Sequence, residues 1–204
     1  MRFKTLLFCV CLPLFSIGQN LNFRYHIDKI AIFNGDSQLC EYQFSELCEF
    51  SEGLAWAAKG DLYGFVDSNG REIIPFDYVE VSNFYEGVAL VARDSGLRFQ
   101  LINSNGDSLT AHLFSDYTYF KDVYLPVKVE DHWGLLATNG SLVVDTISLI
   151  PPVFIRHDFV IVKSVDGYEV WSTSGQKSHA GTFDYISRHG EAWLNGKKYW
   201  INLR

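Results

Sequence analysis

The sequence predicts an all-β protein made of tandem repeats of about 35 residues, each with three short antiparallel strands, in an open solenoid-like or propeller-like array. Three observations lead to this prediction: an aromatic-rich composition, a turn motif that recurs at a nearly constant interval, and short apolar segments flanking each turn. The 204 residues include 16 Phe, 11 Tyr and 5 Trp, and rings suit pleated surfaces better than helices. With 48% apolar and 20% charged residues, the chain is too apolar to be disordered.

The turn motif is the strongest repeat signal. It places a Ser or Thr, then an Asn or Ser, before a glycine, and its glycines are 36, 34 and 35 residues apart. Asn-Gly and Ser-Gly pairs favour positive φ and close tight hairpins. Four such turns at one period predict a repeat array. The glycines are Gly70, Gly106, Gly140 and Gly175.

An aromatic ring stands seven residues before each of these glycines, where a short apolar strand leads into the turn. Because every repeat must fill the same space, we expect these four rings in the core. A second apolar segment follows the turn and ends in an aromatic corner that contains an acid. The recurrent rings are Tyr63, Phe99, Trp133 and Tyr168, and the corner acids are Asp77, Asp116 and Asp184.

The predicted repeats span residues 50–83, 84–119, 120–157 and 158–189, with partial units at 30–49 and 190–204. The first partial unit lacks an opening strand, and the last stops before its turn. Terminal units of a stack are expected to be atypical, because one of their faces has no neighbour. No linker interrupts the chain, so we expect residues 19–204 to form a single array.

Residues 1–18 have the pattern of a signal peptide. Arg2 and Lys4 precede an apolar run over residues 6–17, and Gly18 ends a cleavage pattern of small residues. The run is too short to span a membrane as a helix. The alternative is a buried N-terminal strand. We therefore expect export to the periplasm, cell surface or medium, and a mature chain without a transmembrane span.

Charge argues against nucleic acid as a partner. The chain carries 17 basic and 24 acidic residues, and loss of the two basic residues of the leader changes the net charge from −7 to −9. A net-negative protein without a basic stripe lacks the footprint that phosphate backbones demand. The same deficit argues against docking on an anionic membrane.

Cys40 and Cys48 are the two cysteines that remain after the leader is removed, and an oxidising compartment would allow them to pair. On one extended strand they would be roughly 26 Å apart, beyond the reach of a disulfide. A bridge between Cys40 and Cys48 therefore requires a turn between them. The alternative is two buried thiols.

The motif set resembles the WG-repeat family of bacterial β-rich repeat proteins. The copy over residues 50–85 contains Phe-x-Glu-Gly-Leu-Ala, Tyr-Gly-Phe-Val-Asp, Ser-Asn-Gly and Ile-Ile-Pro-Phe-Asp-Tyr, and Trp133 with Gly134 forms the dipeptide that names the family. Gln100 and Glu169 replace the glycine after the ring in two repeats. The resemblance implies a β-rich scaffold without a shared catalytic activity.

Motifs for chemistry are absent from the sequence. No Gly-x-Ser-x-Gly elbow, phosphate-binding loop, dinucleotide fingerprint, HExxH or Cys-x-x-Cys occurs. The six histidines lack the tight pair spacing of a zinc site. Repeated corner acids could bind calcium or act as an acid–base pair, but Asp beside a turn usually accepts backbone N–H bonds. We expect no enzyme, no cofactor and no metal.

Four tryptophans do not share one repeat position and are the candidates for an exposed binding patch: Trp56, Trp171, Trp193 and Trp200. The alternative is that they too belong to the core or its rim. The leading hypothesis is an exported, non-enzymatic scaffold that binds a protein partner. A carbohydrate-binding module that uses exposed rings is the second hypothesis, and a hydrolase with acids from the repeat corners is the third.

Overall fold

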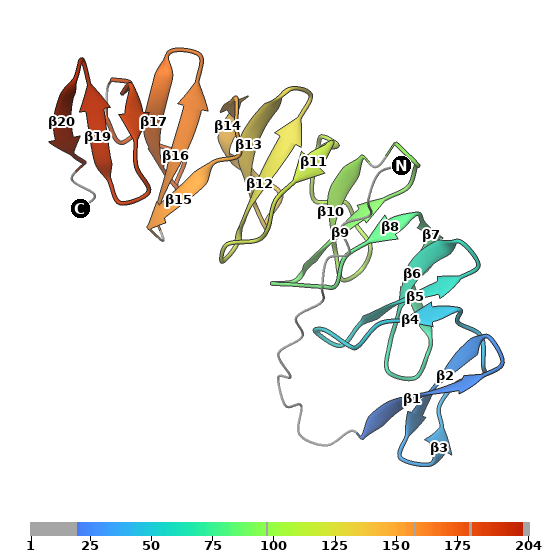
Figure 1. The fold of residues 1–204 in the computed structure, drawn as a ribbon. Coiled ribbons are helices and arrows are strands. Elements are labelled where there is room, and N and C mark those ends of the chain that lie inside the picture. The colour runs from blue at the N-terminus through green and yellow to red at the C-terminus, as the bar shows by residue number, and fades with distance from the viewer. Residues whose placement is uncertain (1–19, 97, 157, 180, 202–204) are drawn as a thin grey trace. The chain divides into compact units, whose positions relative to one another are not determined.

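The computed structural model describes residues 20–201 except 97, 157 and 180, so the predicted signal peptide at residues 1–18 lies outside the described residues. Every regular element in this described range is a β-strand, and neighbouring strands pair antiparallel, which confirms the all-β prediction (Figure 1). Packing divides the chain into two compact parts, residues 1–76 and 77–204. No helix in the described range is long and apolar enough to cross a membrane.

The N-terminal part contains two sheets, with strand orders β1-β2-β3 and β4-β5-β6-β7. The part boundary falls inside β7, the last strand of the second sheet. The strands are β1 Leu21–His26, β2 Lys29–Asn34, β3 Ser37–Gln38, β4 Glu46–Leu47, β5 Ala55–Lys59, β6 Leu62–Val66 and β7 Glu72–Tyr78.

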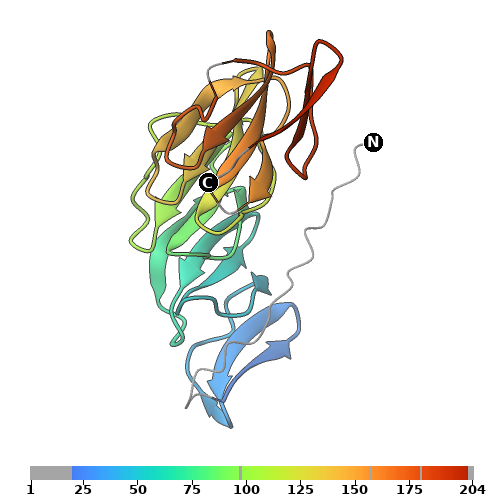
Figure 2. The ribbon, with the colours of Figure 1, turned by 90° about the vertical axis from the view of Figure 1, so that its left-hand side faces the viewer.

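The C-terminal part contains four sheets, with orders β10-β9-β8, β11-β12-β13-β14, β15-β16-β17 and β18-β19-β20, and their tight hairpin connections can be followed in two views (Figures 1 and 2). The strands are β8 Glu80–Val81, β9 Val88–Ala92, β10 Phe99–Asn103, β11 Asp116–Tyr117, β12 Tyr124–Val129, β13 His132–Ala137, β14 Leu142–Ser148, β15 Val153–Arg156, β16 Phe159–Ser164, β17 Gly167–Ser172, β18 Tyr185–Ile186, β19 Glu191–Leu194 and β20 Lys197–Trp200.

The recurring glycine turns are formed as the sequence predicts. In each turn the glycine N–H donates to the carbonyl three residues earlier, at 2.9 Å for Gly70, Gly106 and Gly140 and at 3.0 Å for Gly175. The first turn residue often reinforces this bond, because the carboxylate of Asp67 accepts the N–H groups of two later turn residues at 2.8 and 2.9 Å. Local hydrogen bonding of this kind explains why the motif tolerates variation around an invariant glycine.

The N-terminal repeat differs from the sequence prediction, because it has an opening strand. Leu21–His26 forms β1 and pairs along its whole length with β2, from Leu21 opposite Asn34 to His26 opposite Lys29. The connecting turn uses Ile27, whose φ is 58°, in place of a glycine. An apolar residue in a left-handed turn carries no recognisable turn signal, so the strand was not expected from the sequence.

Each sheet also begins earlier than the predicted repeat. The sheet of residues 50–83 starts at β4, in the aromatic corner of the preceding segment, and its neighbour in the C-terminal part starts at β8. The sheets β4-β5-β6-β7 and β11-β12-β13-β14 have four strands, where the sequence predicts three. The corner that closes one repeat supplies the first strand of the next, which links consecutive repeats through backbone hydrogen bonds.

The core is shared between neighbouring sheets of one part. In the C-terminal part, Leu90 and Leu101 of β9 and β10 pack in one buried cluster with Leu125 and Leu136 of β12 and β13. A second cluster joins Val170 of β17 to residues of β18 and β19. Each small sheet thus buries a face that it could not bury alone, which is the stabilising principle of a repeat array.

Candidate binding surface

The recurrent rings have a structural role. Phe99 and Trp133 are 8% exposed, and Tyr63 and Tyr168 are half-buried. Phe99 packs edge-on against Tyr117 with ring centroids 4.9 Å apart. Phe99 and Trp133 thus lie in the core, whereas Tyr63 and Tyr168 lie at its rim.

The recurrent turn glycines are required by close packing as well as by positive φ. A Cβ on Gly70, whose φ is 75°, would lie 2.5 Å from the Cβ of Cys40, and one on Gly175 would lie 2.5 Å from the carbonyl oxygen of Val143. Gly140 approaches the carbonyl oxygen of Leu109 in the same way. The turns of Gly70, Gly140 and Gly175 therefore each pack against the repeat before them.

Cys40 and Cys48 are not bonded to each other in the structure. The Cys40 sulfur accepts the N–H of Ile32 at 3.4 Å, and the side chain lies against the Gly70 turn. This packing directs Cys40 into the contact between two hairpins. The half-buried environment matches the alternative of two thiols.

The glycine after the ring decides whether a sheet has a fourth strand. A Cβ on Gly64 would lie 2.7 Å from the carbonyl oxygen of Ile74 in β7, and one on Gly134 would lie 2.8 Å from that of Val144 in β14. Where Gln100 and Glu169 replace the glycine, β10 and β17 make isolated bridges on this side, Phe99 with Phe114 and Tyr168 with Phe183 among them. A side chain at this position takes the space that the fourth strand needs.

Glu169 fills that space with a buried carboxylate, 7% exposed. It forms an ion pair with Lys177 at 3.0 Å, accepts the indole N–H of Trp171 at 2.8 Å and accepts the Ser164 hydroxyl at 3.3 Å. Burial alone raises the pKa of Glu169, but the hydrogen bonds and the Lys177 charge outweigh it and hold the pKa below the ordinary 4.5. The carboxylate is therefore charged and fully partnered.

The four candidate tryptophans do not form one patch. Trp171 is committed to Glu169, and Trp56 packs edge-on against Tyr63 at 5.5 Å. Trp193 is half-buried, whereas Trp200 is 69% exposed. Trp200 therefore remains a candidate for recognition, together with the half-buried Trp193.

Trp193 and Trp200 belong to a continuous group of side chains on β17–β20, which we call the aromatic–lysine cluster. The ring of Tyr185 lies 5.9 Å from that of Tyr168 and 5.4 Å from that of Trp193. The ammonium of Lys198 lies 5.5 Å from the Trp193 ring centre and 5.1 Å from that of Trp200. The cluster combines apolar ring area, cation–π contacts and an exposed indole.

The corner acids have separate structural roles. Asp77 pairs with Arg93 at 3.2 Å, Asp116 accepts the N–H of Tyr117 at 2.8 Å, and Asp184 accepts the N–H of Asn195 at 2.7 Å. The two backbone contacts are those expected of an acid beside a turn. Within the described range, no three His, Cys, Asp or Glu side chains gather where they could hold a metal ion.

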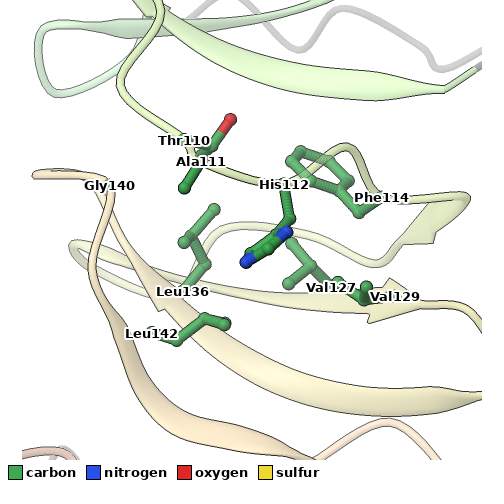
Figure 3. Close-up of a pocket in the computed structure, with 9 residues that line it drawn as sticks. All are labelled: Thr110, Ala111, His112, Phe114, Val127, Val129, Leu136, Gly140 and Leu142. Atoms are coloured by element: carbon green, nitrogen blue, oxygen red, sulfur yellow. The ribbon is translucent and has the colours of Figure 1, made fainter.

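A small pocket lies between the segment that follows β10 and the sheet β11-β14 (Figure 3). Its volume is about 140 Å³. The imidazole of exposed His112 projects over the strand that carries Val127, and the walls are otherwise apolar apart from Thr110. The lining residues are Thr110, Ala111, His112, Phe114, Val127, Val129, Leu136, Gly140 and Leu142.

Sequence reasoning missed both the pocket and the polar partners of the cluster. Lys198 was unremarkable in the sequence, and the pocket residues come from segments up to 32 positions apart. A comparison of equivalent positions among the repeats would have found the pocket, because Val129 and Leu142 stand where other repeats have polar or charged residues. Recurrent residues mark the positions that stay the same in every repeat, whereas binding sites arise where the repeats diverge.

No curated protein matches the chain. Among solved structures, it is similar to Hsv2 of Kluyveromyces lactis, with 12% identity and a TM-score of 0.41 over 79% of this chain and 60% of that one. A form of that protein with loop 6CD replaced by a Gly-Ser linker gives 13% and 0.42 over 85% and 69%. A protein of unknown function from Bacteroides caccae gives 18% and 0.29 over 78% and 70%. These TM-scores leave both the solenoid-like and the propeller-like arrangement open.

The family comparison is more direct. Residues 63–95 match the model of the WG containing repeat. The match starts at the recurrent ring Tyr63 and extends through the Gly70 turn and the Phe76 corner into the next opening strand, β9. Both the sequence motifs and the recurring antiparallel hairpins agree with it. Residues 63–95 thus match one WG containing repeat, and the turns, rings and hairpins of the other repeats resemble it.

Proposed function

We propose that the chain is an exported, non-enzymatic WG-repeat scaffold that binds a protein partner through the aromatic–lysine cluster. Export is proposed from the signal-peptide pattern of residues 1–18. The absence of catalytic motifs in the sequence, together with the structural roles of the corner acids, supports a binding role over catalysis. The chain would thus serve as a platform rather than as an enzyme.

The observation that carries the proposal is the exposure of aromatic side chains around Lys198. Trp200 is 69% exposed and contacts Lys198, and Tyr185 is 50% exposed and contacts Trp193. Trp and Tyr beside a cation are the side chains that dominate protein–protein binding energy.

The charged side chains around the cluster indicate which kind of partner it would bind. Residues 185–201 contain three basic side chains, Arg188, Lys197 and Lys198, and one acid, Glu191, in a chain whose net charge is −7. Glu191 forms an ion pair with Lys198, so Arg188 and Lys197 supply the excess positive charge. A local positive surface on an acidic protein attracts an acidic partner and repels further copies of itself. We therefore expect a partner segment with acidic and apolar side chains.

Carbohydrate binding is the second candidate, and the exposure of Trp200 is the observation that favours it. An indole that projects into solvent can stack on the apolar face of a sugar ring. Lys198 lies against the rings of both Trp193 and Trp200, which leaves less open ring surface than a sugar platform requires. Retention on immobilised glycans that is lost in Trp200→Ala would favour this candidate.

The test is a pull-down with residues 19–204 from envelope and secreted extracts, with proteins identified by mass spectrometry. The matched variants are Trp200→Ala with Tyr185→Ala, which removes the exposed rings, and Tyr25→Ala, which removes a ring that is 72% exposed in the N-terminal sheet. Loss of a hot-spot ring should weaken binding about tenfold or more. A protein lost with the first variant and kept with the second supports the proposal.

Equal recovery of all proteins by the wild-type chain and both variants would contradict a role for the cluster. Turnover of a glycan or peptide by the wild-type chain, abolished in Asp77→Asn with Asp184→Asn, would overturn the non-enzymatic assignment. Both readouts use the same purified proteins, so one preparation decides between a scaffold and a hydrolase.

A further inference from the structure

We infer that the pocket beside His112 is a recognition site for one phenyl-sized apolar side chain of the partner protein. The inference rests on the proposed function in one respect, namely that the ligand is a protein. The pocket itself lies on β12–β14 and the segment before β11, and shares no residue with the aromatic–lysine cluster (Figure 3).

The size of the pocket selects a side chain over a metabolite. Its volume is about 140 Å³. Pockets for drug-sized ligands usually measure about 300–1,000 Å³, whereas an apolar cavity of about 150 Å³ accommodates benzene. A phenylalanine ring therefore matches the available space. Phe114 in the wall and His112 over the strand offer ring edges and faces for aromatic contact.

An equivalent site two repeats earlier is closed by an ion pair. Lys59 and Glu72 stand 70 residues before Val129 and Leu142, and the same spacing relates Phe44 to the pocket residue Phe114. The backbone confirms this register, because the N–H of the residue after each phenylalanine donates to the carbonyl of the residue before Lys59 or Val129. The Lys59 ammonium lies 3.7 Å from the Glu72 carboxylate and 5.7 Å from the Phe44 ring centre.

The equivalent positions one repeat later are also occupied by polar side chains. Ser164 and Lys177 stand 35 residues after Val129 and Leu142, and both bind the buried carboxylate of Glu169. Trp171 stands 35 residues after Leu136 and donates to the same carboxylate. A polar network therefore connects the three positions that are apolar around the pocket.

The remaining equivalent pair is Arg93 and Ser108. Arg93 pairs with Asp77 at 3.2 Å, and the Ser108 hydroxyl donates to Gln100 at 3.0 Å. Of these four repeats, the one with the pocket is the one with two aliphatic residues at these positions. Leu142 is 38% exposed, so an apolar residue faces solvent where the other repeats hold a polar or charged one.

The stability of the fold does not require the aliphatic pair Val129 and Leu142. A role in ligand binding would account for it. The same backbone frame accepts a Lys–Glu ion pair, a buried carboxylate network or an aliphatic pair, so the aliphatic pair is one of several compatible solutions. The aliphatic solution creates a cavity, and an unfilled apolar cavity costs stability. A partner side chain that fills it recovers the missing contacts.

The experiment uses N-acetyl-phenylalanine amide as the probe and N-acetyl-alanine amide as its control, titrated into residues 19–204 labelled at Val and Leu methyl groups. We expect saturable NMR shifts at Val127 and Leu136 with the phenylalanine probe, and an affinity about tenfold or more above that of the alanine probe. The variant Val129→Lys with Leu142→Glu transplants the ion pair of the earlier repeat and should abolish these shifts.

Two further variants keep the test decisive. Ala111→Trp places a ring at the exposed mouth of the pocket, and Leu149→Glu changes a residue that is 45% exposed and outside the lining. Binding should be lost in the first and unchanged in the second. Equal affinity for both probes, or phenylalanine binding that survives both Ala111→Trp and the transplanted ion pair, overturns the inference. Since no partner is present in this assay, its failure is separate from a failed pull-down.

Discussion

Gly134 and Val144 approach so closely that a Cβ on Gly134 would lie 2.8 Å from the Val144 carbonyl oxygen. Gly134 belongs to the dipeptide that names the family, and Val144 lies in β14, the fourth strand of its sheet. The requirement is steric, since Gly134 is not among the glycines with positive φ. The name-giving glycine is therefore the residue that admits a fourth strand.

Substitution Gly134→Ala is expected to destabilise the protein by about 1–3 kcal/mol, because one added methyl group must displace backbone atoms of β14. Gly181→Ala is the matched control, since a Cβ on Gly181 meets nothing within 4 Å. It should change the free energy of unfolding by less than about 0.5 kcal/mol. Urea denaturation of both variants measures the difference, and equal stability would contradict the steric account.

Glu169→Gln should lower stability by about 1–3 kcal/mol at neutral pH, because Lys177 loses the charge of its partner. The folded-state pKa of Glu169 lies below 4.5, so its contribution is present above that value and is lost as pH falls through the folded pKa. The difference in Tm between wild type and Glu169→Gln should shrink from about pH 7 to about pH 3. A difference independent of pH would exclude the charged network.

Lys59→Val with Glu72→Leu should create a second pocket in the N-terminal part, because it introduces the residue pair found at Val129 and Leu142. The phenylalanine probe should then show a second set of saturable shifts. Lys59→Arg with Glu72→Asp retains the opposite charges and should leave a single site. A single site in both variants would mean that these two positions are insufficient to form the pocket.

Cys40 and Cys48 should both react with an alkylating reagent when residues 19–204 are unfolded without a reductant, because the two are not bonded to each other in the structure. Mass spectrometry counts the adducts. The contact of Cys40 with the Gly70 turn should also make its alkylation in the folded protein slow. Two unmodified cysteines in the unfolded chain would instead show that the pair is oxidised.

The repeat period, the glycine turns and the core position of two of the recurrent rings could be predicted because each rests on a few adjacent residues. The strand β1 was missed because its turn uses Ile27, although Asp28 offered a signal. An aspartate stands two residues before the ring position in other repeats too, as Asp61 stands before Tyr63 and Asp131 before Trp133. In the hairpin of β1 and β2, whose turn has no glycine, Asp28 is therefore the sequence signal.

Trp200 illustrates the limit for the candidate site. The sequence identified it as non-recurrent together with Trp56 and Trp171, and nothing in the spacing separated the three. Tertiary packing separates the three. Trp171 donates a hydrogen bond to Glu169 and Trp56 packs against Tyr63, whereas Trp200 is exposed. Exposure depends on what lies opposite a side chain, which one-dimensional spacing does not contain.

The sequence by itself determined the resemblance to the WG repeat, the all-β class and the places of the repeat turns, because these follow from local backbone preferences and their period. Only the tertiary structure decided that Gly64 and Gly134 admit a fourth strand, that Glu169 replaces it with an ion-paired carboxylate, and that Val129 and Leu142 leave a pocket. These features arise where segments up to 32 residues apart meet in space. Their physical cause is the competition of a side chain and a neighbouring strand for the same volume.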